Sequence, residues 1–237
     1  MDLSEVSENQ NRHPWELSRT ACILRQLKRL GIHGNVLDIG CGDSYFDRRL
    51  LAENPGLTVY GVDIYLKNEI HEGNLHAVSS LDLLPDMKFD FILMMDVLEH
   101  IEDDRGYLKE VTRKYLNGGG YIVITVPAFN SLYSLHDEEL RHFRRYNHRD
   151  LKAVITESGL RETRWTYFYL SLILGRLLTK NKTENLSKWT RPAADFITRF
   201  VVWVLNTDFA VCSALSRIAV HVPGLSLLSV CKVKEER

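Results

Sequence analysis

The sequence predicts an α/β protein built on a doubly wound parallel sheet. Segments with strand patterns alternate with segments that show helical spacing along most of the chain. Several of the predicted strands end in an acidic residue or run into glycines, and Phe89–Asp96 is an apolar run suited to the buried centre of a parallel sheet. Right-handed crossovers between such strands place helices on both faces of the sheet.

The first part of the chain is expected to hold two helices and three strands. Apolar residues recur at helical spacing from Pro14, and Gly31 is the expected end of that helix. A second helix is predicted over 44–53, where Asn54-Pro55-Gly56 follows. Residues 1–13 are expected to form a mobile tail. The predicted strands are Val36–Ile39, Thr58–Ile64 and a short one around Ala77–Val78.

The second part continues the alternation after Phe89–Asp96. A helix over about 103–116 should end at Asn117-Gly118-Gly119-Gly120, and a helix over 149–158 has Gly159 as its C-cap. Helical patterning returns in a long insertion between the last two predicted strands. The further strands are Tyr121–Val126, Arg161–Phe168 and Leu225–Val233, and the helical segments of the insertion are Leu170–Leu178 and Ala193–Val222.

Composition narrows the class of protein. With 237 residues, 45% of them hydrophobic, the chain can bury a full core, and its formal net charge of -1 gives no reason to expect a nucleic-acid partner. The four cysteines are far apart, with no CxxC pair and no histidine at zinc spacing, so we predict reduced thiols, no metal site and a cytoplasmic location. The N-terminus is polar and acidic, unlike a secretory signal. The apolar stretches of the last third are interrupted by Arg176, Asn206, Asp208 and Arg217, which argues against a membrane-spanning helix.

The most informative motif is the turn Gly40-Cys41-Gly42 after the first strand. Gly40 allows a sharp turn, Gly42 allows a ligand to approach bare backbone, and the next helix directs free N–H groups at that ligand. A dinucleotide fingerprint would need a third glycine where Tyr45 stands, so the loop does not match a tightly held pyrophosphate.

Other polar residues follow strands at the same edge of the predicted sheet, where ligands bind in such folds. Asp63 stands at the end of the second strand, in a position that suits a carboxylate accepting from ribose hydroxyls. Ser79-Ser80-Leu81 follows the third strand, and Asp96-Val97-Leu98-Glu99-His100 follows the fourth.

Taken together, these motifs resemble the class I S-adenosylmethionine (SAM)-dependent methyltransferases. VLDIGCGDSYF is similar to the first motif of that family, YGVDI to the second, FDFILMMDVLEHIEDD to the fourth-strand motif and LNGGGYIVITVP to the fifth. The resemblance covers about 14–165 and the last strand. It implies a single domain on a mostly parallel seven-stranded sheet whose last strand is antiparallel, with a cofactor-binding core over 14–168, a helical insertion over 169–222, and the last strand and tail over 223–237.

The resemblance also implies roles for residues in binding SAM and its product S-adenosylhomocysteine. Backbone of the Gly40-Cys41-Gly42 turn would hold the methionine part, with Asp38 near its amino group and Arg19 reaching its carboxylate. On the adenosine side, Asp63 would bind the ribose, Ile64 and Leu81 would cover the two faces of the adenine, and Ser80 stands where many relatives have an acid. Asp96 and Val97 would lie under the sulfonium end.

The acceptor side is expected in the His-, Arg- and Tyr-rich stretch over 133–146. His136, held by a neighbouring carboxylate, is the first candidate for a general base, and His142 and His100 are the others. Arg144 and Arg145 would bind an anionic substrate group or form ion pairs within the protein, and Tyr133 and Tyr146 complete the predicted substrate-binding set.

The helical insertion over 169–222 is rich in large apolar residues. It is expected to be a self-packed cap, a lid over an apolar acceptor, a dimer interface or a surface for peripheral contact with lipid. Methyl transfer to an oxygen or nitrogen of a small or lipid-linked acceptor is the predicted function. A SAM-binding module without catalysis and a nicotinamide-dependent oxidoreductase are the alternatives.

Overall fold

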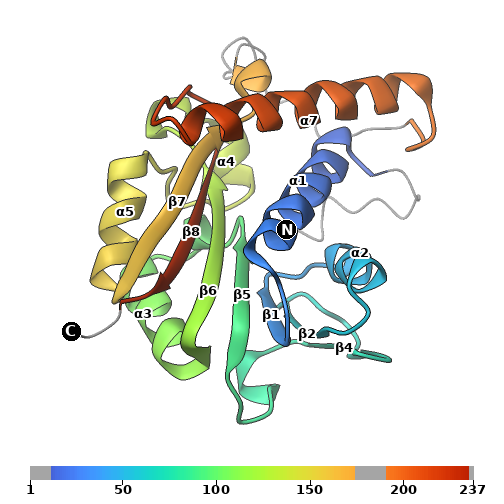
Figure 1. Ribbon diagram of the computed structural model, residues 1–237, viewed down its shortest axis with the longest axis vertical. Helices are drawn as coiled ribbons and strands as arrows, with labels where there is room; N and C mark the ends of the chain where they lie inside the picture. Colours follow the sequence, from blue (N-terminus) through green and yellow to red (C-terminus); the bar gives the residue numbers. More distant parts are fainter. Residues whose placement is uncertain (1–11, 174–190, 235–237) are drawn as a thin grey trace.

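The computed structural model describes residues 12–173 and 191–234, which fold around one twisted sheet (Figure 1). The strands of the core are β1 (Asn35–Ile39), β2 (Thr58–Val62), β3 (Ile70–Glu72), β4 (Leu75–Val78), β5 (Phe89–Met95), β6 (Leu116–Pro127), β7 (Leu160–Phe168) and β8 (Ser226–Val233). The α-helices are α1 (Pro14–Leu30), α2 (Tyr45–Glu53), α3 (Asp104–Tyr115), α4 (Leu135–Glu139), α5 (His148–Glu157) and α7 (Phe196–Ser216).

The sheet order is β3-β4-β2-β1-β5-β6-β8-β7. Parallel pairing joins β4, β2, β1, β5 and β6, and β8 runs antiparallel to both β6 and β7. The doubly wound, mostly parallel sheet with an antiparallel last strand is therefore confirmed. It has eight strands instead of seven, because the short strand β3 pairs antiparallel with β4 at the edge of the sheet.

Helices cover both faces of the sheet, and alternate residues of β5 supply both cores. Ile92 and Met94 pack into one buried cluster with residues of α3 and α5, whereas Phe91 and Leu93 pack into the other with residues of α1, α2 and α7. Figure 1 shows α3 and α5 on one side of the sheet, α1 and α2 on the other, and α7 lying across the top. Burial on both faces explains the continuous apolar run of β5.

The predicted boundaries hold with small shifts. Helix α1 ends at Gly31, whose positive φ of 70° is the left-handed C-cap expected of glycine. Strand β6 begins at Leu116, directly after α3, so the glycines expected to form a loop lie inside that strand. In the insertion, residues 170–173 are helical, and the rest of the predicted Leu170–Leu178 helix lies outside the described residues.

Helix α7 is the described helix that bears on the prediction against a membrane span. Its 21 residues have a mean hydropathy of 1.3, so the helix is long and apolar enough to cross a membrane by length and composition. Of the 18-residue apolar window within it, 28% is buried. The carboxylate of Asp208 accepts the backbone N–H groups of Leu170 and Ser171, so its charge is hydrogen-bonded within the protein. One such helix is by itself weak support for a span, and α7 packs on α1 and β7.

Candidate functional site

The turn between β1 and α2 forms the floor of the site. Gly40 and Gly42 have positive φ values of 78° and 59°, so a side chain at either position would strain the backbone. The Gly40 N–H donates to the Val62 carbonyl at 2.7 Å, which fixes the turn against the end of β2. The turn therefore has the close backbone approach that its sequence predicts.

Asp63 orders this turn from the neighbouring strand. Its carboxylate accepts the Gly42 N–H at 2.9 Å through Oδ2 and the Tyr65 N–H at 2.9 Å through Oδ1. Asp63 thus lies beside the glycine turn, as expected for a ribose-binding residue. Ile64, the next residue, is 76% exposed, so its side chain is open to a planar ligand.

The predicted adenine contacts after β4 form a short helical turn. Ser80 caps the 3-10 helix Leu81–Leu83 by accepting the Asp82 N–H at 3.3 Å. The Leu81 carbonyl accepts the hydroxyl of Tyr115 at 3.3 Å, and the Leu81 side chain is half-buried. The Ser80 hydroxyl is already used as an acceptor in this capping bond.

Two buried carboxylates lie behind the glycine turn. Asp38 and Asp47 are both fully buried, and none of their oxygens has a hydrogen-bond partner among the described residues. Burial raises the pKa of Asp38 well above its ordinary range, and the neighbouring Asp47 adds to that rise. Burial also raises the pKa of Asp47, to about 6. Asp38 lines a pocket together with Arg19, Gly40 and Cys41, whereas Asp47 is not among the lining residues.

Arg19 of α1 covers the pocket from above. Its guanidinium pairs with Asp96, at the end of β5, and stacks 4.3 Å from the ring centroid of Trp15. Asp96 has a positive φ of 56° and also accepts the Thr125 hydroxyl at 3.0 Å, so its carboxylate is fixed between β5 and β6. Arg19 and Asp96 thus meet at the edge of the predicted cofactor site, and Val97 follows Asp96 into the turn before the next 3-10 helix.

The structure organises the 133–146 segment around Asp137, which is fully buried. Asp137 Oδ1 lies 2.9 Å from His142 Nδ1 and accepts the Arg145 Nε–H at 2.8 Å. The partner of this carboxylate is therefore His142, while the ring of His136 lies 4.0 Å from Glu139 and is 39% exposed. The role of His136 as general base stays a prediction.

Three predicted substrate-binding residues turn out to hold the fold together. The Tyr146 hydroxyl lies 2.7 Å from Asp104 Oδ2, and burial raises the pKa of this tyrosine. Arg145 donates to Asp137 and to the Ala128 carbonyl from a buried position, and Arg144 pairs with Asp104 at 3.1 Å. Arg144 and Arg145 both have the internal ion pairs of the alternative prediction. All three residues also line a pocket, so their role in substrate binding stays a prediction.

The loop also brings two of the predicted catalytic histidines together. The rings of His100 and His142 meet edge to face, with centroids 4.7 Å apart. The Phe143 N–H donates to the Glu99 carbonyl at 2.8 Å, and the Tyr133 hydroxyl donates to the His142 carbonyl at 2.7 Å. Tyr133 therefore positions His142, and the loop is attached to the segment that follows β5.

A family model described as a methyltransferase domain matches residues 14–163, more than half of the chain. The chain belongs to the class I SAM-dependent methyltransferases. The match begins at α1 and ends within β7, so it covers both the glycine turn and the 133–146 segment.

Relatives of known name share only part of this methyltransferase. Tocopherol O-methyltransferase of Arabidopsis thaliana is 29% identical over 102 residues, which is 38% of this chain and 29% of that protein. Ubiquinone biosynthesis O-methyltransferase of Pelagibacter ubique is 31% identical over 102 residues, 38% of this chain and 41% of that protein. The chain thus spans less than half of the length of these two relatives. The solved N-methyltransferase NodS of Bradyrhizobium japonicum, in complex with S-adenosylhomocysteine, has the same fold, with a TM-score of 0.57, 15% identity and coverage of 98% of this chain and 95% of that one.

The pocket residues of this methyltransferase fit the cofactor of its family. An unpartnered buried carboxylate, Asp38, suits the ammonium group of a methionine moiety, because a buried charge is stable only when it is paired. The carboxylate of Asp63 and the exposed side chain of Ile64 suit a ribose and an adenine. Arg19 is the cation beside them, and in this structure it pairs with Asp96.

Three carboxylates of this site escape sequence prediction: Asp47, Glu99 and Asp137. Asp47 stands within the expected α2 and carries no motif, and its burial depends on how α2 packs on the sheet. Glu99 and Asp137 lie in short helical turns that the predicted elements do not include. The available signal in the sequence was Glu99 itself, an acidic residue that directly follows the apolar pair Val97-Leu98.

Proposed function

We propose that this protein transfers a methyl group from SAM to an oxygen or nitrogen of a small or lipid-linked acceptor. The observation that carries the proposal is the unpartnered, fully buried Asp38 carboxylate in the pocket beside the Gly40-Cys41-Gly42 turn. SAM supplies a methyl group already activated on a sulfonium, so the protein needs chiefly to bind, to orient and to exclude water.

The chain's own groups divide this work between two sides of the site. Asp38, the glycine turn and Asp63 would hold the donor, with Arg19 near its carboxylate. His142, whose Nδ1 is held by Asp137, is the proposed proton acceptor through its opposite ring nitrogen, with His100 beside it. The buried Asp137 supports this choice over His136, because a held imidazole keeps one tautomer.

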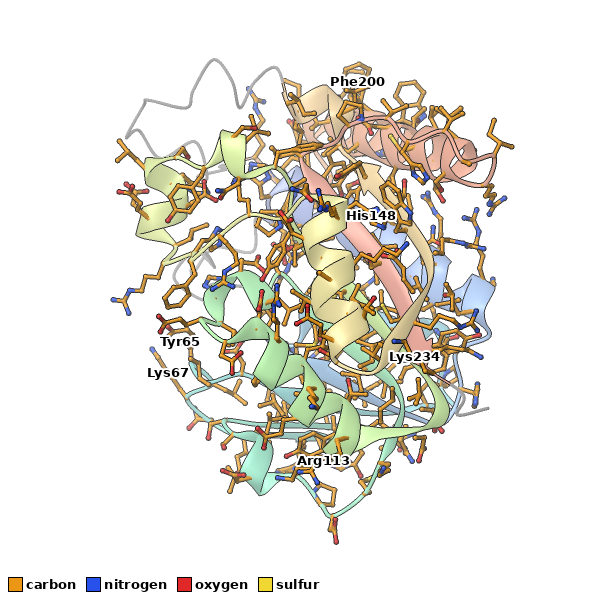
Figure 2. All side chains as sticks on the ribbon, turned by 90° about the vertical axis from the view of Figure 1, so that its left-hand side faces the viewer. Tyr65, Lys67, Arg113, His148, Phe200 and Lys234 are labelled. Carbon is orange, nitrogen blue, oxygen red and sulfur yellow. The ribbon has the colours of Figure 1, made fainter. Side chains whose placement is uncertain are left out.

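The acceptor class is proposed from the outer face of α7. Phe196, Phe200, Trp203 and Val211 recur at helical spacing, and their side chains are between 52% and 80% exposed. Thr207 lies in the same row, and its hydroxyl donates to the Trp203 carbonyl instead of to solvent. Figure 2 shows Phe200 at the top of the molecule, pointing outward. Such a continuous apolar row is unusual for a surface that faces only water.

Cationic residues border this row on the side that faces α1. Arg199 and Arg217 are both exposed and fall on one edge of the row at helical spacing. Arg25 and Arg29 of α1 are also exposed, on the face that contacts α7 through Ser18 and Asn206. Apolar and aromatic side chains beside arginines match an anionic lipid surface better than they match the same face of a second copy, whose arginines would be repelled. We therefore propose cytoplasmic, peripheral membrane contact through α7.

Calorimetry with SAM, S-adenosylhomocysteine and NAD tests the donor half. Binding of both SAM compounds supports the proposal, and binding of NAD alone refutes it. Transfer of labelled methyl from SAM to molecules in an aqueous and a lipid extract tests the acceptor half. SAM binding without transfer to either extract would favour a binding module that lacks catalysis.

Vesicle co-sedimentation tests the lipid surface. The full chain should bind vesicles that contain phosphatidylglycerol more tightly than vesicles of phosphatidylcholine alone. The double variant Phe200→Ser, Trp203→Ser should weaken binding by roughly tenfold or more, since each large apolar side chain contributes about 1 kcal/mol or more when it leaves water. Tyr65→Ser is the matched control, because Tyr65 is also exposed and lies on a different part of the surface (Figure 2). A protein that stays in the supernatant and forms dimers by light scattering would refute membrane contact.

A further inference from the structure

Three side chains that can bind a metal ion, one glutamate and two histidines, meet on the acceptor side of the site. One ligand atom each from Glu99, His100 and His142 lies within 4.8 Å of the other two. Two histidines and one carboxylate are the ligand set of several zinc and non-haem iron sites. Ligands that share one ion at about 2.1 Å lie about 3–3.5 Å apart, so small side-chain rotations bring these three atoms to coordination distance.

The fold positions the histidines for ligation. His100 ends the 3-10 helix Leu98–His100 directly after β5, and the Phe143 N–H bond to the Glu99 carbonyl holds His142 against it. His142 uses Nδ1 toward Asp137, which leaves Nε2 as the nitrogen for a ligand. Metal-binding histidines commonly have such a carboxylate behind the ring, because it fixes the tautomer and raises the basicity of the other nitrogen.

Glu99 is the second and independent observation. Its side chain is fully buried, and neither carboxylate oxygen has a hydrogen-bond partner among the described residues. An unpaired buried carboxylate is strongly unfavourable, so the folded protein gains from any cation that compensates it.

We propose that Glu99, His100 and His142 bind one divalent transition-metal ion, such as Zn²⁺, Mn²⁺ or Fe²⁺. Three protein ligands leave coordination positions open, and a neutral histidine pair with one carboxylate favours these ions over Mg²⁺ or Ca²⁺, which prefer oxygen ligands.

The role of this ion rests on the proposed function, whereas its binding does not. An acceptor hydroxyl bound at an open position has a lower pKa. Its O–H bond then breaks and the proton leaves to water, because Nε2 of His142 is occupied by the ion; with the ion bound, the ion replaces His142 as the group that activates the acceptor. The oxygen electron pair forms the new bond to the methyl carbon as the sulfur–methyl bond breaks, which yields the methyl ether and S-adenosylhomocysteine.

The direct test is a titration of the full chain, without an added histidine tag, after removal of metals with a chelator. Co²⁺ is the first probe, since its visible absorption reports the ligand geometry, and Zn²⁺ competition then gives the affinity. We expect one equivalent to bind, and the variants Glu99→Gln and His142→Gln to weaken binding by roughly 100-fold or more. Retained SAM binding by calorimetry shows that each variant is folded, and His100→Gln replaces any variant that is not.

A surface histidine pair provides the matched control. His71 and His76 lie with their Nδ1 atoms 3.4 Å apart on β3 and β4, and Glu69 lies 3.2 Å from His71, so this exposed group is a competing place for added metal. The double variant His71→Gln, His76→Gln should keep the Co²⁺ spectrum and the stoichiometry. The metal site is overturned if metal binding is lost in this variant alone. It is also overturned if the parent chain binds none of Zn²⁺, Mn²⁺, Fe²⁺ and Co²⁺. A chain that binds metal and SAM but transfers no methyl group contradicts the proposed function and leaves the metal site standing.

Discussion

Replacing Asp38 by asparagine should raise the stability of the protein while it weakens cofactor binding. The Asp38 carboxylate is fully buried and has no hydrogen-bond partner among the described residues, so its negative charge lowers the stability of the folded protein until a ligand cation binds. An unsatisfied buried polar group costs about 1–3 kcal/mol, and an amide of the same shape avoids the additional cost of ionisation. For a domain of this size, a gain of about 1–2 kcal/mol corresponds to a rise in Tm of roughly 2–6 °C.

The pH dependence follows from the raised pKa of Asp38. The folded protein holds the proton of Asp38 more tightly than the unfolded chain does. The parent protein therefore loses stability as the pH rises from about 4, the ordinary pKa of aspartate, to the raised pKa of Asp38 in the folded state. The advantage of Asp38→Asn should therefore be absent at acid pH and grow toward neutral pH. Thermal unfolding at several pH values without ligand measures it.

SAM affinity should change in the opposite direction. A charge-assisted hydrogen bond contributes about 1.5–3 kcal/mol, so Asp38→Asn should bind SAM roughly 10- to 150-fold more weakly by calorimetry. Asp47→Asn is the control, since Asp47 is equally buried but does not line the pocket. It should gain stability and weaken SAM binding much less than Asp38→Asn does, because it removes a neighbour of Asp38 and leaves the Asp38 carboxylate in the pocket. A destabilised Asp38→Asn that binds SAM as the parent does would refute the assignment of Asp38 to the ammonium group.

Three further substitutions probe the surroundings of the site. Gly61→Ala would place a Cβ 2.8 Å from Cys41 Sγ, so it should destabilise the protein by about 1–3 kcal/mol in urea unfolding and weaken SAM binding; an unchanged affinity would contradict the packing under the glycine turn. Ile64→Ala should lower SAM affinity by roughly tenfold and leave unfolding within about 0.5 kcal/mol, because the side chain is exposed until a ligand covers it. Tyr146→Phe removes the hydroxyl from Asp104 and should cost about 1–3 kcal/mol in urea unfolding; loss of SAM binding without loss of stability would argue against its structural role.

The donor side of the site could be predicted because its determinants are local. The Gly40-Cys41-Gly42 turn needs positive φ values that glycine alone adopts readily, and Asp63 reaches that turn because neighbouring parallel strands end at one edge of the sheet. Both facts follow from short stretches of sequence and a regular fold.

The acceptor side could not be predicted in the same way, because its contacts join distant turns. Asp137 lies beside His136 in sequence, yet its carboxylate contacts His142 and Arg145, since the short α4 turns the chain back on itself. The contact of Asp137 with His142 could not be inferred from sequence adjacency, and His136 has Glu139 as a neighbouring carboxylate. The burial of Glu99 beside His142 could likewise not be predicted, because in the sequence it is one of several acidic residues after the β5 segment.

Helix α7 shows how one charge can mislead a prediction in the opposite direction. Asp208 interrupts the apolar run in sequence, and this charge argued against a membrane-spanning helix. In the structure this half-buried carboxylate accepts backbone N–H groups of Tyr169, Leu170 and Ser171, away from the exposed apolar row. The outer side keeps its apolar row intact. A charge therefore excludes a membrane-facing helix only when it lies on the exposed face, and the position of Asp208 is what makes contact of α7 with a lipid surface physically reasonable.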